Sequence, residues 1–161
     1  MNFEPDNIIV GAASVSIGPN AEVNLGYTKG GVSVRYENEL VETLADQVVG
    51  VVDKSRSLER MFVAFSMTEA TIANLSFYFD VAGDGSSMTV PSVANACNVN
   101  GGKLTIIGVG PSCTTRKFTF NRCFVSKGTE YKMSREEETL IEVEFEVMKN
   151  SSGQFGTIID L

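Results

Sequence analysis

Residues 139–148 read Thr-Leu-Ile-Glu-Val-Glu-Phe-Glu-Val-Met, and this stretch decides the fold class. Apolar side chains occupy every second position, and glutamates occupy the positions between them. A period of two places the two sets on opposite faces of a β-strand. A slip of one residue would bury the carboxylates, so we expect a firmly fixed register. The predicted core face is Ile141, Val143, Phe145 and Val147, and the predicted acidic face is Glu142, Glu144 and Glu146.

A second alternating stretch runs from Val32 to Thr43 and predicts a long, half-buried strand. Its polar face is again mostly acidic. The apolar positions are Val32, Val34, Tyr36 and Leu40, and the polar positions are Ser33, Arg35, Glu37 and Glu39.

The valine-rich segment that follows supports two interpretations. Val48-Val49-Gly50-Val51-Val52 is apolar, but polar and charged residues bound it on both sides. It is either a buried strand or an extended hairpin or loop whose valines contact another subunit. In a lone monomer the second arrangement would leave an exposed apolar patch, which is the signature of an interaction site.

One helix is expected. Met61 to Phe65 is apolar at every position, so this strand should be covered on both faces. Ser66-Met67-Thr68-Glu69 then has the spacing of a capping box. The pattern predicts a helix from about Met67 to Phe77 that covers one side of the sheet. Its candidate buried face is Ala70, Ala73, Leu75 and Phe77.

Composition excludes several classes of function. The chain has 161 residues without a linker or repeat, which predicts a single domain over residues 1–161. A net charge of −7 argues against binding nucleic acid through phosphates. Histidine and tryptophan are absent, and Cys97, Cys113 and Cys123 do not form a zinc or disulfide pattern. We therefore expect no catalysis, no metal and no cofactor, and the sequence shows neither a signal peptide nor a membrane span.

The order of several stretches resembles that of bacteriophage tail tube proteins. They begin with Ile9-Val10-Gly11-Ala12-Ala13 and with Leu25 to Val32, which opens the long strand. Tyr36 to Asp53, with Ala45-Asp46-Gln47 and the valines, follows. The stretch Met67 to Leu75, the strand at Ile141 to Phe145 and Phe155-Gly156-Thr157-Ile158-Ile159-Asp160 complete the likeness.

The resemblance implies a mainly β fold, a β-sandwich or barrel with one flanking helix. Six such subunits close into a ring, and rings stack into a hollow tube with a β-lined lumen. Residues 1–10 would form an N-terminal arm, and residues 44–58 an extended loop that reaches the neighbouring ring. Implied partners are other copies, tape measure, baseplate or tail-tip and terminator proteins, and a sheath in a contractile tail. The implied location is the virion tail, after synthesis in the host bacterial cytoplasm.

Two sets of residues are candidate sites under this resemblance. A conduit must not retain DNA, and carboxylates on its wall repel phosphate. The inter-ring set is Asp46, Gln47, Val48, Val49, Val51, Val52 and Asp53, and the lumen-lining acidic set is Glu37, Glu39, Glu142, Glu144 and Glu146. The alternatives are a tube subunit of a phage-derived contractile injection or type VI-like secretion particle, and a monomeric β-sandwich binding module. An enzyme would have to rely on carboxylates alone, as glycosidases do.

Overall fold

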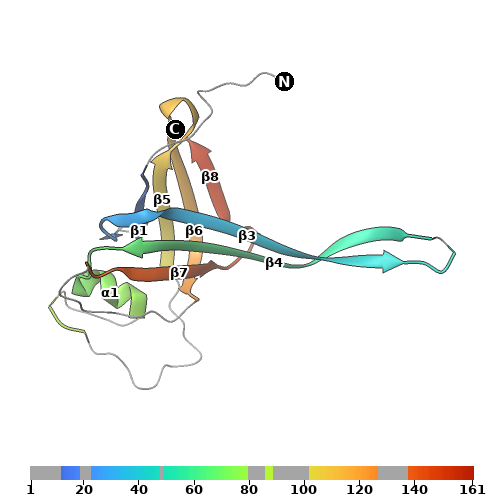
Figure 1. Ribbon diagram of the computed structural model, residues 1–161, viewed down its shortest axis with the longest axis horizontal. Coiled ribbons are helices and arrows are strands. Elements are labelled where there is room, and N and C mark those ends of the chain that lie inside the picture. Colours follow the sequence, from blue (N-terminus) through green and yellow to red (C-terminus); the bar gives the residue numbers. More distant parts are fainter. Residues whose placement is uncertain (1–11, 19–22, 48, 80–85, 89–101, 127–137) are drawn as a thin grey trace.

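The structure, a computed structural model, describes residues 12–18, 23–47, 49–79, 86–88, 102–126 and 138–161. In this part of the chain it is mainly β, with one short α-helix (Figure 1). The strands are β1 (Ser14–Ile17), β2 (Val23–Asn24), β3 (Thr28–Leu44), β4 (Val51–Met67), β5 (Gly102–Val109), β6 (Thr115–Val125), β7 (Ile141–Val147) and β8 (Gly156–Asp160). The helix is α1 (Ile72–Phe79), and a 3-10 turn covers Pro111–Cys113.

All strand pairs are antiparallel, in the order β2-β1-β5-β6-β7-β4-β3. Strand β6 is the junction: its first part pairs with β8 and its last part, from Cys123 to Val125, pairs with β7. Between these parts, the register against β5 shifts between Phe120 and Cys123, which marks a β-bulge or irregularity. The strands β5, β6 and β8 therefore run across the direction of β3, β4 and β7 (Figure 1).

The sheet is open, so the barrel half of the predicted sandwich or barrel is wrong. Its two ends, β2 and β3, are not paired with each other in the described part of the chain. Strand β2 contributes only two residues, which is too short for a ladder that would close the sheet.

The hydrophobic core lies between the two groups of strands. Strand β7 has the predicted register, since its apolar residues are at most 3% exposed and Glu142 is exposed. Strand β4 is buried on both faces at Phe62 and Val63, as its apolar run predicted. The buried core consists of Val15, Ile17, Leu25, Val63, Phe65, Met67, Leu75, Leu104, Ile106, Phe120, Cys123, Ile141, Val143, Phe145 and Val147.

The helix is present but begins later than the predicted Met67. Ser66 lies in β4 opposite Glu142, so the expected capping box does not form. Instead the Thr71 hydroxyl accepts the Asn74 backbone N–H at 3.2 Å, which caps the helix at this point. The buried Asn74 amide donates to the Leu25 and Glu69 carbonyls and joins the helix to the body. Of the predicted face, Leu75 is buried, Ala70 packs on the core before the helix starts, Ala73 is exposed, and the Phe77 side chain lies outside the described residues.

Strands β3 and β4 form a hairpin that extends far beyond the body (Figure 1). The last residue of β4 that β7 supports is Met61, opposite Val147. Beyond it, the two strands pair only with each other in the described part of the chain, as far as Leu44 opposite Val51. The long strand from Val32 is therefore confirmed, but the prediction that it is half-buried is wrong, because every residue of β3 after Val32 is exposed. In the described part of the chain no second layer covers its outer half.

Candidate assembly surfaces

The tip of the hairpin is the first candidate surface. Val49 is 107% exposed, Val51 44% and Val52 52%, so the alternative of a buried strand is wrong. Asp46, Gln47 and Asp53 are exposed beside them, and Val48 lies outside the described residues. Most of the segment 44–58, expected to be an extended loop, is the beginning of strand β4, and the turn is confined to the residues before it.

Apolar exposure continues along the outer half of the hairpin. Leu40 and Val41 are each 52% exposed and Leu44 is 72% exposed. Leu44 lies opposite Val51, so the two side chains form an apolar cross-strand pair at the end of the ladder. A strand pair of this kind has neither a core nor a second layer of its own, and isolated two-stranded hairpins are marginal in water.

The second candidate surface is the outer face of β3, β4 and β7. The predicted acidic residues come from two strands that are separated by β4, and the register brings them to one face. Glu142, Glu144 and Glu146 lie opposite Ser66, Ala64 and Phe62. Glu37 and Glu39 lie opposite Arg60 and Leu58, at the same alternating positions of β4.

This outer face is mixed in charge. The Arg35 guanidinium lies over the Phe62 ring at 4.8 Å and pairs with Glu37 at 2.7 Å and with Glu144 at 3.7 Å. Arg60 stands opposite Glu37. Part of the negative charge is therefore neutralised locally. The five glutamates still outnumber these two arginines, so the face keeps an acidic excess.

A shallow hollow lies on the same face where the hairpin leaves the body. Its lining is Glu37, Asn38, Glu39, Leu58 and Arg60. In the described part of the chain there is no group of His, Cys, Asp and Glu side chains that could hold a metal ion, and no helix long and apolar enough to cross a membrane.

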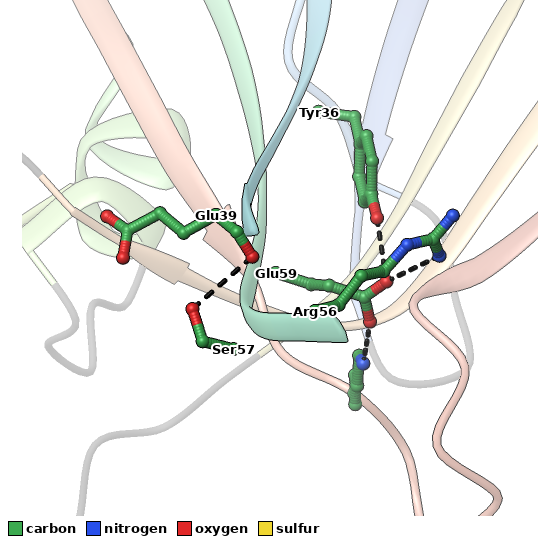
Figure 2. A network of polar contacts seen from close by, with 6 residues as sticks. Tyr36, Glu39, Arg56, Ser57 and Glu59 are labelled. Atoms are coloured by element: carbon green, nitrogen blue, oxygen red, sulfur yellow. Dashed lines mark hydrogen bonds and ion pairs between the residues drawn. The ribbon is translucent and has the colours of Figure 1, made fainter. Parts of the chain in front are cut away.

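A polar network that the sequence analysis missed lies on the opposite face, at the root of the hairpin (Figure 2). The Glu59 carboxylate accepts hydrogen bonds from the Tyr36 hydroxyl at 2.7 Å, from Arg56 at 3.0 Å and from the Lys149 ammonium. The Lys149 ammonium lies 5.1 Å from the centre of the Phe155 ring, which meets Tyr36 edge-on at 6.4 Å. These five residues, which we call the root cluster, come from β3, β4 and the segment that follows β7.

The root cluster perturbs two ionisable groups. The hydrogen bonds from Lys149, Tyr36 and Arg56 lower the pKa of the Glu59 carboxyl to about 2. The hydrogen bond to Glu59 raises the pKa of Tyr36. Only the spacing of Arg56 and Glu59 was visible in the sequence. Nothing local connects them with Lys149, because the sheet pairing brings that residue near.

An ion pair at the free end of β8 is the remaining charged contact of note. The Arg116 guanidinium donates to both oxygens of Asp160, at 2.6 and 2.8 Å, and this contact lowers the pKa of the Asp160 carboxyl. It holds β8 against β6, where the stretch Phe155 to Asp160 ends the sheet.

Comparison with known proteins finds similarity among solved structures. No protein-family model matches the chain, and a search of curated proteins finds no match. Among solved structures, the chain is similar to a chain in the cryo-EM structure of the anti-feeding prophage (AFP) baseplate, 6-fold symmetrised. The TM-score is 0.53 at 10% identity, and the match covers 100% of this chain and 97% of that chain. At this identity the likeness concerns the fold.

Proposed function

We propose that the chain is a structural subunit of a phage tail tube, whose copies close into hexameric rings that stack into a hollow channel for genome delivery. The observation that carries this proposal is the outer half of the β3–β4 hairpin, which exposes leucines and valines well away from the body (Figure 1). The fold that the chain shares with part of a 6-fold symmetrised baseplate is consistent with such an assembly.

The tip of the hairpin is the proposed contact with the neighbouring ring. Burying Val49, Val51 and Val52 would contribute at most ~1.5–3 kcal/mol per side chain, before the cost of ordering. We place the acceptor of the tip on a different surface of the next copy, which makes the proposed contact heterologous. Such a contact repeats from copy to copy without closing, and it builds a filament.

The acidic outer face is the proposed wall of the channel. Glu37 and Glu39 with the three glutamates of β7 lie on this one face. Carboxylates there repel DNA phosphates, whereas lysine or arginine in excess would bind them through counterion release. DNA would then pass through without specific binding, and the chain would act as a conduit without catalysis.

A related candidate is a tube-like component of a phage-derived contractile injection or type VI-like secretion particle. The likeness to a chain of the anti-feeding prophage baseplate favours it. In either particle the proposed partners are further copies, with tape measure, terminator and baseplate or tail-tip proteins, and a sheath if the tail is contractile. The proposed location is the particle's tail, after synthesis in the bacterial cytoplasm.

The double substitution Val49→Asp with Val51→Asp tests the proposal. Both side chains are exposed in the subunit, so we expect a folded protein with an unchanged circular dichroism spectrum. Desolvating two carboxylates at a contact between copies is costly, so tubes and rings should be lost. Size-exclusion chromatography and negative-stain microscopy measure the assembly.

The matched control is Ser112→Asp with Asn121→Asp, which adds the same two charges at exposed positions of the body. Assembly of the control should equal that of the parent. A parent chain that stays monomeric at every concentration would contradict the proposal and favour a binding module. Tubes that still form from the valine variant would contradict the role of the tip.

A further inference from the structure

The hairpin projects from the body, and a small set of side chains connects the two at its root. Beyond Tyr36 and Met61, β3 continues from Glu37 to Leu44 without support from β7. At ~3.4 Å per residue this free part is about 27 Å long, so a tilt of about 10° at the root moves the tip by about 5 Å. Apolar contacts need heavy atoms within about 4.5 Å, so such a displacement is enough to lose a contact at the tip.

Glu59 lies where the hairpin leaves the body. It is opposite Asn38, in the second pair beyond the last pair that β7 supports. Its side chain is only 20% exposed although the neighbouring hairpin residues are open to water. The Glu59 carboxylate thus accepts hydrogen bonds from both strands of the hairpin, through Tyr36 and Arg56 (Figure 2). It also accepts one from the body, through Lys149.

The contacts of the root cluster close on themselves. Lys149 reaches Glu59 and also lies over Phe155, and Phe155 meets Tyr36, which returns to Glu59. The turn between Lys149 and Phe155 is itself fixed, because the Asn150 side chain accepts the backbone N–H groups of Ser152 and Gln154. Because these contacts form a closed ring on a fixed turn, they restrain the direction of the hairpin as well as its distance from the body.

A β-bulge lies one residue pair further out along the hairpin. Leu58 is opposite Glu39 and Arg56 is opposite Leu40, so Ser57 is the extra residue of a β-bulge. Its hydroxyl donates to the Glu39 carbonyl at 3.3 Å (Figure 2). Bulges increase the local twist of a strand pair. The bulge therefore sets the rotation of the outer half relative to the root that Glu59 fixes.

We propose that Glu59 is a positioning residue for assembly: with Lys149 it fixes the angle at which the hairpin leaves the body, so that the tip meets its acceptor on the next copy. The proposal rests on the assembly role given to the tip above. Partly exposed ion pairs contribute little to stability. The cluster therefore serves to fix direction, and its loss should leave the fold intact.

The orientation of the hairpin is measurable without assembly. In a Cys97→Ser background, spin labels on exposed Cys113 and on Val49→Cys report the distance from body to tip. Cys123 is buried, with its pKa raised to about 12, so it does not take the label. Labelled copies are diluted in unlabelled protein, so that only distances within one chain contribute.

Glu59→Ala and Lys149→Ala should both broaden the distance distribution, and Glu59→Gln, which keeps an acceptor, should broaden it less. The matched control is Glu42→Ala, which also removes an ion-paired carboxylate from the hairpin. Glu42 contacts Lys54 of the partner strand at 2.7 Å, and within the described residues it has no ion pair with the body, so this control should keep the narrow distribution. An unchanged distribution in both Glu59→Ala and Lys149→Ala would overturn the proposal.

Assembly gives the second measurement. The critical concentration for tube formation should rise about tenfold in Glu59→Ala, at the lower end of typical couplings between sites, and stay unchanged in Glu42→Ala. A broadened hairpin with normal assembly would overturn the positioning role while leaving the proposed function intact. A parent chain that stays monomeric at every concentration would overturn the proposed function instead, whatever the labels show, and assembly that survives charges at Val49 and Val51 would overturn the role of the tip.

Discussion

The inner and outer halves of strand β4 make opposite use of apolar residues. In β4, Val63 is 0% exposed and Phe65 5%, whereas Val51 and Val52, further out on the same strand, are about half exposed. The inner half has β7 beside it and a second layer of strands over it. The outer half has only its hairpin partner in the described part of the chain.

The difference shows that one strand can serve two purposes. Apolar residues of the inner half stabilise the subunit, because folding removes them from water. Those of the outer half stay in water in the single chain, so they gain this free energy only if another molecule covers them. The predictions below test this division, from the largest expected effect to the smallest.

Truncating an apolar side chain in each half of the hairpin should lower the free energy of unfolding by very different amounts. Phe65 stacks on Phe145 at 6.1 Å in the core, so Phe65→Ala should lower the free energy of unfolding by about 3–5 kcal/mol. Leu44→Ala at the outer end should change it by less than about 0.5 kcal/mol. Urea unfolding measures both. Equal losses would show that the outer half belongs to the folding core.

The two faces of the outer half should differ in their effect on DNA. Glu39→Lys adds positive charge on the acidic outer face, and Glu42→Lys makes the same change three residues on, on the other face. If the outer face lines the channel, tubes of Glu39→Lys should retain DNA in a salt-dependent way, and those of Glu42→Lys should not. Co-sedimentation over a range of salt concentrations measures retention. The reverse result would place the other face in the channel.

Acid should weaken the hydrogen bonds at the root of the hairpin. The Lys149, Tyr36 and Arg56 hydrogen bonds lower the pKa of Glu59 from 4.5 to about 2 in the folded chain. Its contribution to stability is therefore present above pH 4.5 and is lost as the pH falls towards 2.

The thermal midpoints of the parent and of Glu59→Gln should therefore converge as the pH falls through this range. Calorimetry between pH 7 and pH 2 follows the convergence, and carboxyl NMR measures the Glu59 pKa directly. Because Asp160 also has a lowered pKa, beside Arg116, Asp160→Asn serves as the comparison on the body. A constant difference between the parent and Glu59→Gln at all pH values would contradict this role of the carboxylate.

Local pattern was sufficient for much of the fold. The alternation at Ile141 to Val147 predicted the buried face of β7, and the run at Met61 to Phe65 predicted a strand covered on both sides. Period-two patterns work here because neighbouring side chains of a strand must point to opposite faces. The predicted start of the helix was wrong because β4 continues through Ser66. Pairing with β3 and β7 holds this residue in the strand, so it cannot cap the helix.

The sequence by itself determined the β class, the register of β7, the acidic character of its outer face and the apolar character of the segment around Val49. The tertiary structure alone decided that Val49 lies in water, that the glutamates of β3 and β7 share one face, and that Lys149 meets Glu59. The physical reason is that the strand pattern depends on neighbours along the chain. Burial and long-range ion pairs depend on which strands end early, and here β7 ends at Val147 while β3 and β4 continue without it.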